Sequence, residues 1–224
     1  MSQMPLFAGT SQSVLVNDEL GRITYTADLV PAEVARAWFA ELRESVRWKS
    51  QRRRMYDRDV DVPRLMAHVR LDPEEGPTLG AIRVAAGNVV SRTRVAFNSV
   101  GLNFYRDGND SVAPHNDDLN EIVEGTPIAL LSLGATRRMT IRAKEPPRRV
   151  LNVELEAGSL LVMSYETQLH YTHGIPKTKE PVGPRISLAF RVTQADGSGD
   201  YRPARARFSS RLKSRTTGHD DTLQ

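Results

Sequence analysis

The sequence of 224 residues contains no cysteine. Disulfide bonds are therefore excluded, as are zinc sites and iron–sulfur clusters that depend on thiolate ligands. No apolar run approaches the roughly 18 residues that a membrane-spanning helix needs, and the start of the sequence lacks the basic-then-apolar pattern of a secretion signal. We therefore expect a cytoplasmic protein that does not contact a membrane. The sequence specifies no oligomeric state, and a monomer is our expectation.

Excess charge is also modest, since the net charge is +4, but the positive residues are clustered. Five cations lie within Arg47–Arg54, and a second cationic stretch runs from Arg202 to Arg215. Such clusters suit a polyanion, and nucleic acid comes first among polyanions. A solvated surface explains the same clusters equally well.

Apolar spacing predicts two helices. The first begins near Pro31 and carries Val34, Trp38 and Leu42 at four-residue intervals, which makes Trp38 a core residue. The second covers residues 77–90. Between them, residues 51–76 are polar and broken by proline and glycine, so they predict a long loop. Residues 1–20 carry few signals and predict an irregular or partly ordered start.

The rest of the sequence is rich in short β-branched and aromatic segments separated by turn residues. Many short strands at this spacing predict a mainly β fold with flanking helices, arranged as a sandwich or barrel, and a jelly roll is one such arrangement. The predicted strands are Arg22–Thr26, Val95–Tyr105, Ile128–Leu133, Met139–Ala143, Val150–Leu155, Ser159–Ser164 and Arg185–Thr193.

Two histidines and one aspartate form a candidate metal site. His115 and Asp117 are two residues apart, so on an extended segment both side chains point to one face. His173, expected in a loop before the final strand, supplies a third ligand. Two imidazoles and one carboxylate leave open positions on a non-haem Fe(II), although zinc accepts the same ligands. His170 and His68 are alternatives to His173, and a solvated loop pair is the alternative for His115 and Asp117.

Two arginines indicate an anionic ligand near that site. Arg185 and Arg191 share one face of the last predicted strand, because they are six residues apart and the residues of opposite parity are apolar. A buried arginine needs an anionic partner, and a dicarboxylate can bind it through paired hydrogen bonds. Asn103 and Tyr105 share a face of an earlier strand and can add two neutral donors. The alternative is that both arginines point to solvent.

In order and spacing, these motifs resemble the AlkB family of Fe(II)- and 2-oxoglutarate-dependent dioxygenases across about Met55 to Val192. The resemblance implies a double-stranded β-helix (jelly-roll) core and an N-terminal nucleotide-recognition lid, at Arg47 to Arg70. The segments that carry the resemblance are Asn103–Gly108, Pro114–Asp118, Ile128–Ala135, Gly158–Met163, Tyr171–Lys177, Gly183–Arg185 and Phe190–Arg191.

The resemblance also implies an organisation and an activity. Residues 1–92 would hold the N-terminal extension, helices and lid, and residues 93–194 the catalytic core, in a single domain overall. Residues 195–224 are expected to form a basic, mobile tail on composition alone, because they are rich in Gly, Ser, Thr and Arg and lack apolar periodicity. The activity would be oxidative removal of N-alkyl (methyl) groups from nucleobases in DNA or RNA with O2, releasing formaldehyde, succinate and CO2. The resemblance assigns Fe(II) to His115, Asp117 and His173. It places Tyr105 and Arg185 at the distal carboxylate of 2-oxoglutarate. It places Asn103 and Arg191 at the keto-acid end.

Contacts to alkylated nucleic acid are less clearly implied, and the candidates are Tyr56, Arg64, His68 and Asp118. His68 stands where relatives place a Trp or Tyr for stacking on a flipped base. Ser187 and Ala189 stand where the fuller family form has Asn and Thr. Two alternatives therefore stay open: the same core acting as a small-molecule or protein hydroxylase, and a non-catalytic nucleic-acid-binding module.

Overall fold

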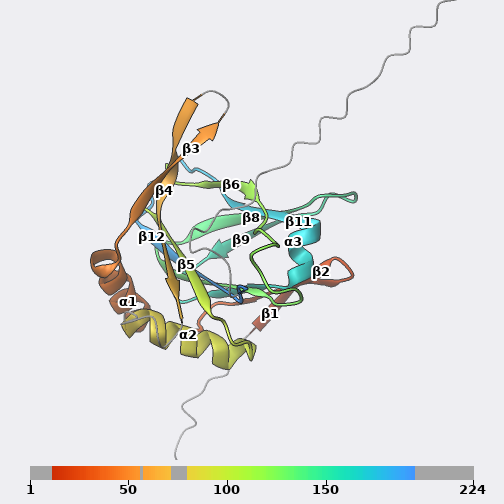
Figure 1. Cartoon of the computed structure of the whole chain (residues 1–224), viewed down its shortest axis with the longest axis horizontal. Helices are drawn as coiled ribbons and strands as arrows, with labels where there is room; N and C mark the ends of the chain where they lie inside the picture. The colour runs from red at the N-terminus through yellow and green to blue at the C-terminus, as the bar shows by residue number, and fades with distance from the viewer. Residues whose placement is uncertain (1–11, 56–57, 72–79, 195–224) are drawn as a thin grey trace, which may run out of the picture.

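Two antiparallel sheets make up most of the computed structural model, which describes residues 12–55, 58–71 and 80–194 (Figure 1). The larger sheet has the spatial order β1 (Gln12–Asp18), β2 (Gly21–Thr26), β10 (Leu160–Met163), β7 (Ile128–Gly134), β12 (Arg185–Arg191), β5 (Ser99–Tyr105), β4 (Arg58–Arg70) and β3 (Lys49–Met55). The smaller sheet has the order β6 (Val112–His115), β11 (Tyr171–Ile175), β8 (Arg137–Ala143) and β9 (Val150–Leu155). This mainly β, two-sheet arrangement agrees with the predicted jelly roll.

Burial patterns along the strands show which faces meet. In β8 burial largely alternates, so one face, with Met139 and Ile141, packs inward and the other faces solvent. In β12 every residue is buried, because that strand lies at the middle of the larger sheet and is covered on both faces. The inner face of β12 therefore looks across a core toward the smaller sheet, as the parity of Arg185 and Arg191 predicted.

Two apolar cores lie on opposite faces of the larger sheet. One lies between the sheets and includes Ile23, Leu130 and Ile141. The other lies between the larger sheet and two long helices, α1 (Ala32–Ser45) and α2 (Gly80–Thr93) (Figure 1). Trp38 is buried in this second core, as its helical spacing predicted. Pro31 immediately precedes α1, where its missing N–H costs no hydrogen bond. A third helix, α3 (Tyr165–His170), is short.

One prediction about the N-terminal region was wrong, and another missed a strand. The loop predicted for residues 51–76 is largely the hairpin of β3 and β4, which pair antiparallel. Residues 65–70 of β4 also pair with β5, so an extended backbone is enforced by the neighbouring strand in spite of the polar sequence. Residues 1–20, predicted as an irregular or partly ordered start, include the unpredicted strand β1, which pairs with β2.

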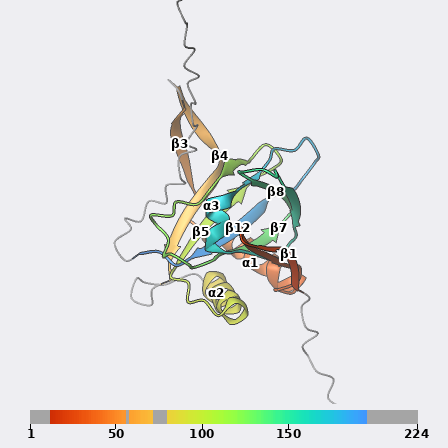
Figure 2. The ribbon, with the colours of Figure 1, turned by 90° about the vertical axis from the view of Figure 1, so that its right-hand side faces the viewer.

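Strands from both sides of residue 93 share one sheet. β2 pairs with β10, and β4 pairs with β5, so the segment before residue 93 forms both flanks of the larger sheet. The division into residues 1–92, 93–194 and 195–224 stays a prediction, and the last of these segments lies outside the described residues. Figure 2 shows the β3–β4 hairpin extending beyond the other strands.

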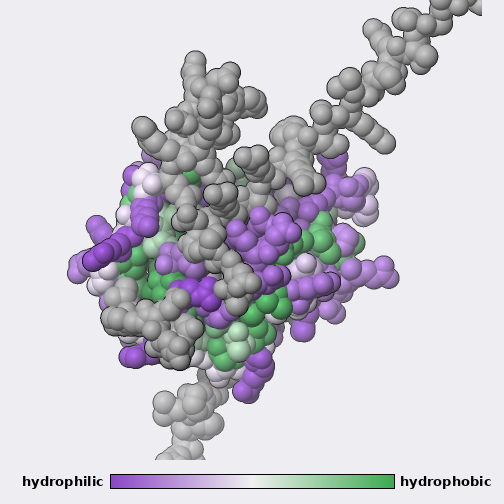
Figure 3. Space-filling view, viewed as in Figure 1, coloured by the Kyte–Doolittle hydropathy of each residue, from purple (hydrophilic) through white to green (hydrophobic). Residues whose placement is uncertain are grey.

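The surface is mixed in character. Figure 3 shows hydrophilic side chains over much of the visible face, with smaller apolar areas between them. Large exposed apolar side chains, such as Val14, Val84 and Leu169, belong to different elements. In the part of the chain that the structure describes, no helix combines the length and apolarity needed to cross a membrane.

Candidate metal centre and adjoining pocket

Three candidate metal ligands converge between the sheets. β11 pairs with β6 so that His173 lies directly opposite His115, with ring centroids 4.5 Å apart. Asp117 follows β6 by two residues, and ligand atoms of the three side chains all lie within 4.8 Å of one another. His173 lies in a strand and not in the predicted loop, because β6 and β8 both pair with its segment. His170 and His68 are not in this group of described side chains.

Gly174 allows the close approach of β6 and β11. A Cβ atom at Gly174 would lie 2.8 Å from the Val112 carbonyl oxygen and 3.0 Å from the Pro114 nitrogen. Contacts of this length to backbone atoms are too short for a side chain. The glycine that follows His173 therefore lets the two strands carry His173 and His115 into contact.

The histidines are held as neutral ligands. A carbonyl oxygen only accepts hydrogen bonds, so His115 Nδ1 donates to Ala113 O at 2.9 Å and leaves Nε2 to bind a metal. That Nε2 lies 4.0 Å from Asp117 Oδ1. Burial lowers the pKa of His115, and burial together with His115 lowers the pKa of His173 to about 3. Both rings are therefore uncharged near neutral pH, the form that binds a metal.

Asp117 is oriented from two sides. Its Oδ2 accepts hydrogen bonds from Arg191 Nε at 3.1 Å and Nη2 at 2.9 Å, while its backbone N–H donates to Gln168 Oε1 at 3.2 Å. Burial raises the pKa of Asp117, but Arg191, His173 and His115 together outweigh burial, and the pKa falls to about 2. Gly101 leaves room for this guanidinium, since a Cβ there would lie 3.1 Å from Arg191 Nη1.

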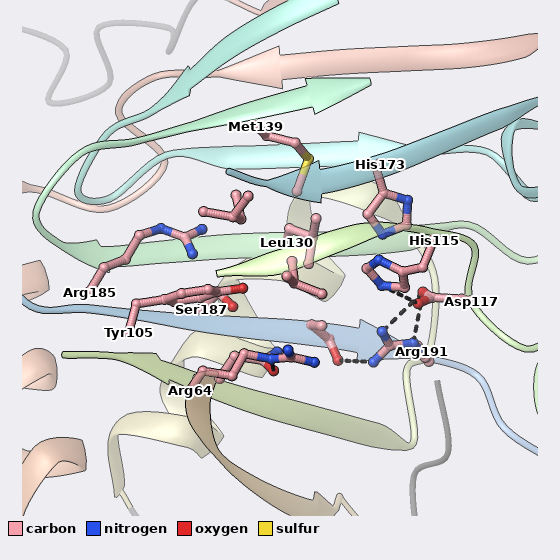
Figure 4. A pocket seen from close by; sticks show the side chains of 14 residues that line it. Arg64, Tyr105, His115, Asp117, Leu130, Met139, His173, Arg185, Ser187 and Arg191 are labelled. Carbon is pink, nitrogen blue, oxygen red and sulfur yellow. Dashed lines mark hydrogen bonds and ion pairs between the residues drawn. The ribbon is translucent and has the colours of Figure 1, made fainter. Parts of the chain in front are cut away.

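A buried cation lies at the other end of the same pocket (Figure 4). Arg185 is 1% exposed, and its Nη2 donates to Ser132 Oγ at 2.9 Å. Its Nε and Nη1 are buried with no hydrogen-bond partner among the residues that the structure describes. Burial lowers the pKa of Arg185, and its Cζ lies 5.2 Å from the centre of the Tyr105 ring. Such an arginine is suited to a carboxylate, which accepts two hydrogen bonds from one guanidinium.

The pocket between these ends has an empty volume of about 420 Å³, including its opening to solvent. Leu130 and Met139 lie between the metal ligands and Arg185 (Figure 4). The lining residues are Arg64, Asn103, Tyr105, Val112, His115, Asp117, Leu130, Met139, His173, Ile175, Arg185, Ser187, Ala189 and Arg191. The site fits a divalent metal at one end and a small dicarboxylate that reaches Arg185 at the other.

The remaining predicted site residues are only partly brought together. Arg64 and Asn103 both line the pocket, and Arg64 Nε donates to Asn103 Oδ1 at 2.7 Å. His68 lies outside the pocket lining, with Nε2 2.8 Å from Ser99 Oγ. Asp118 is also outside the lining, and its Oδ1 accepts hydrogen bonds from Asn120. Tyr56 lies outside the described residues.

Some contributors had no signal in the sequence. Gln168 lies 51 residues from Asp117 and in a different element, so no local pattern connects them. Ser132 bonds Arg185 because β7 pairs with β12, which places Ser132 opposite Ser187. Gly174 is the exception, because a glycine next to a candidate ligand in a strand indicates close backbone approach.

Comparisons with known proteins agree with this geometry. Residues 22–191 match the family described as the 2OG-Fe(II) oxygenase superfamily. The human protein named DNA oxidative demethylase ALKBH2 is 40% identical over 122 residues, which cover 51% of this chain and 46% of that protein. The bovine alpha-ketoglutarate-dependent dioxygenase alkB homolog 3 is 30% identical over 199 residues, which cover 81% of this chain and 70% of that protein.

A solved structure supports the fold alone. The crystal structure of a Pseudomonas putida prolyl-4-hydroxylase superposes with a TM-score of 0.53 at 17% sequence identity, covering 76% of this chain and 92% of that one. The chain matches about half the length of the mammalian ALKBH2 proteins, with 43% to 50% of each covered.

Proposed function

Because the chain belongs to the AlkB family within the 2OG-Fe(II) oxygenase superfamily, we propose that it removes N-alkyl groups oxidatively from nucleobases of nucleic acid. The family uses Fe(II), 2-oxoglutarate and O2. One observation carries the proposal: a His–Asp–His group and a buried, partly unpartnered arginine occupy opposite ends of one pocket.

In this proposal His115, Asp117 and His173 hold Fe(II). His115 offers Nε2 because Nδ1 is committed to Ala113, and Asp117 offers Oδ1 because Arg191 holds Oδ2. When bound, Fe(II), 2-oxoglutarate and O2 supply the oxidising power that hydroxylates an N-alkyl carbon, after which formaldehyde leaves the base and succinate and CO2 are released. No side chain has to act as a general base in this chemistry.

The co-substrate is proposed to lie along the pocket. Arg185 and Tyr105 bind its distal carboxylate, and the two bare guanidinium nitrogens of Arg185 supply the donors. Asn103 and Arg191 lie nearer the keto-acid end. Arg64 fixes the Asn103 amide, since it donates to Oδ1 and so turns Nδ2 away from itself. Leu130 and Met139 form an apolar wall that keeps bulk water from the middle of the pocket.

The proposed substrate is alkylated DNA, because the human relative at 40% identity is named a DNA oxidative demethylase; RNA is the second substrate to test. The hairpin of β3 and β4 is the proposed lid, with Tyr56, Arg64, His68 and Asp118 as candidate contacts. His68 would have to leave Ser99 to stack on a base. A cytoplasmic location and a monomeric state are part of the same proposal.

The experiment is anaerobic loading with Fe(II), addition of 2-oxoglutarate and N-methylated oligonucleotides in air, and mass spectrometry of the nucleosides. Demethylated base with matching succinate is the expected result, for DNA and RNA in parallel. Succinate formed at an equal rate without any oligonucleotide would indicate a hydroxylase of another substrate. Absence of succinate under every condition would indicate a non-catalytic binding module.

A further inference from the structure

Arg137 lies beside the proposed co-substrate pocket but does not line it. It begins β8 and is only 3% exposed. Its guanidinium donates to three backbone carbonyls: Nη1 to Asp107 O at 2.9 Å, and Nη2 to Asp110 O at 3.0 Å and Pro176 O at 2.8 Å. Two of these carbonyls lie in the connection between β5 and β6, and the third follows β11. The Arg137 side chain therefore links the β5–β6 connection to the segment after β11 through hydrogen bonds.

The guanidinium of Arg137 also packs on Tyr105. Its Cζ lies 5.7 Å from the centre of the Tyr105 ring, while Cζ of Arg185 lies 5.2 Å from the same centre. Cations at this distance from an aromatic ring attract it, most strongly where water is excluded. Tyr105 itself is only 3% exposed, and its ring therefore contacts the two cations where water is largely excluded. Arg137 thus restricts the residue that stands next to Arg185 in the pocket.

The charge of Arg137 is not cancelled by a bidentate carboxylate. Asp110 and Asp107 both act on its charge, but the Asp110 carboxylate makes its close ion pair with Arg106, at 2.8 Å and 2.9 Å. Burial lowers the pKa of Arg137, and the pKa of Arg185 is lowered by burial and further by Arg137. Two buried cations near one ring therefore favour an anion at this end of the pocket.

We propose that Arg137 is a positioning residue for 2-oxoglutarate, which fixes Tyr105 and the surrounding backbone so that Arg185 and Tyr105 receive the distal carboxylate together. This inference rests on the proposed assignment of Arg185 and Tyr105 to that carboxylate. A purely structural role is the competing explanation, because loss of three hydrogen bonds also destabilises a fold.

The test measures the Kd of 2-oxoglutarate by calorimetry on the full-length chain loaded with Mn(II) and kept free of oxygen. Arg137→Gln removes the charge, Arg137→Lys keeps it, and Arg138→Gln is the matched control. Arg138 is the next residue of the same strand, with its side chain exposed and paired to Glu154. We expect Arg137→Gln to raise the Kd about tenfold, Arg137→Lys to raise it less, and Arg138→Gln to leave it unchanged. The Mn(II) affinity should stay the same in all three.

A merely structural role would lower the melting temperature without changing the Kd of the folded protein. Folded Arg137→Gln with wild-type 2-oxoglutarate affinity would overturn the inference. If that variant does not fold, the 2-oxoglutarate affinity of Arg137→Lys decides by the same criterion. In steady-state kinetics, Arg137→Lys should have a higher KM for 2-oxoglutarate and an unchanged kcat. An Arg185→Met variant that binds 2-oxoglutarate normally would instead refute the proposed co-substrate site itself.

Discussion

The two ends of the pocket differ in how far the protein satisfies its own polar groups. At the metal end, Asp117 is bonded to Arg191 and Gln168, and His115 is bonded to Ala113. At the other end, Arg185 donates a side-chain hydrogen bond to Ser132, and two of its buried nitrogens have no partner among the described residues. The first end is arranged before any ligand arrives, whereas the second is completed by one.

This difference indicates two kinds of affinity. A metal binds more tightly when its ligands are already oriented. The residues that hydrogen-bond to the ligands therefore contribute to metal affinity. An anion that binds Arg185 supplies hydrogen-bond acceptors to a buried cation that lacks them. The unsatisfied cation lowers the stability of the ligand-free protein, and the bound anion removes that cost. Mutations at the two ends should therefore separate metal binding from co-substrate binding.

The largest effect is expected from removing an imidazole. His115→Ala or His173→Ala should abolish 2-oxoglutarate turnover while the circular dichroism spectrum is retained, because two ligands bind Fe(II) too weakly. His170→Ala is the matched control, since His170 is outside the ligand group. Wild-type succinate production by His173→Ala would show that the metal end is assigned wrongly.

Lowering the pH should reduce the folding stability of the metal-free protein through the metal-binding end of the pocket. The pKa of His173 is about 3 in the folded chain against 6.5 for an unperturbed histidine, because of burial and then His115. Between these pH values the unfolded chain binds the proton first, so stability is complete above about pH 6.5 and falls as the pH is lowered. The loss is on the order of 5 kcal/mol.

Urea unfolding of the metal-free protein at a series of pH values checks this expectation. His173→Gln lacks the titrating ring and should lose correspondingly less stability on acidification. Parallel pH curves for the two proteins would mean that His173 is solvated in the folded state.

At the opposite end, Arg185→Met should weaken 2-oxoglutarate binding by about 100-fold or more, since hydrogen bonds to charged groups contribute about 1.5–3 kcal/mol each. Metal affinity should stay near that of the wild type. Without ligand, the variant should be at least as stable as the wild type, because an apolar side chain replaces an unsatisfied cation. A calorimetric Kd, a Mn(II) titration and a thermal melt measure the three quantities, and a strongly destabilised variant would show that Arg185 is satisfied in the free protein.

The smallest effect is expected from substituting Gln168, which hydrogen-bonds to a metal ligand but does not bind the metal itself. Gln168→Leu removes the acceptor for the Asp117 backbone N–H and should lower Fe(II) affinity about tenfold, as is common for residues that orient a ligand. With metal saturating, 2-oxoglutarate affinity should not change. Glu166→Gln, exposed on the same short helix, is the control, and equal metal affinity in all proteins would remove Gln168 from the site.

The sequence was sufficient for the residues whose positions follow from local spacing. Arg185 and Arg191 could be placed by the two-residue period of a strand, and the first long helix by its four-residue period. The same spacing brought His115 and Asp117 together, although Asp117 lies just beyond the end of β6. It was insufficient where pairing partners decide the backbone. β6 has four residues and includes Pro114, and it is extended because β11 pairs with it. The β3–β4 hairpin is charged, and it is extended because its two strands pair with each other, while β5 pairs only with residues 65–70 of β4.

An anaerobic titration shows most directly whether one pocket holds Fe(II) at one end and 2-oxoglutarate along its length, with the distal carboxylate at Arg185. The Fe(II)-loaded chain is titrated with 2-oxoglutarate without oxygen, and the visible charge-transfer absorption of the Fe(II)–2-oxo acid chelate is followed. We expect saturation at one equivalent in the wild type, no band in His173→Ala, and saturation only at about 100-fold or higher concentration in Arg185→Met. Saturation of Arg185→Met at the wild-type concentration would contradict this placement of 2-oxoglutarate.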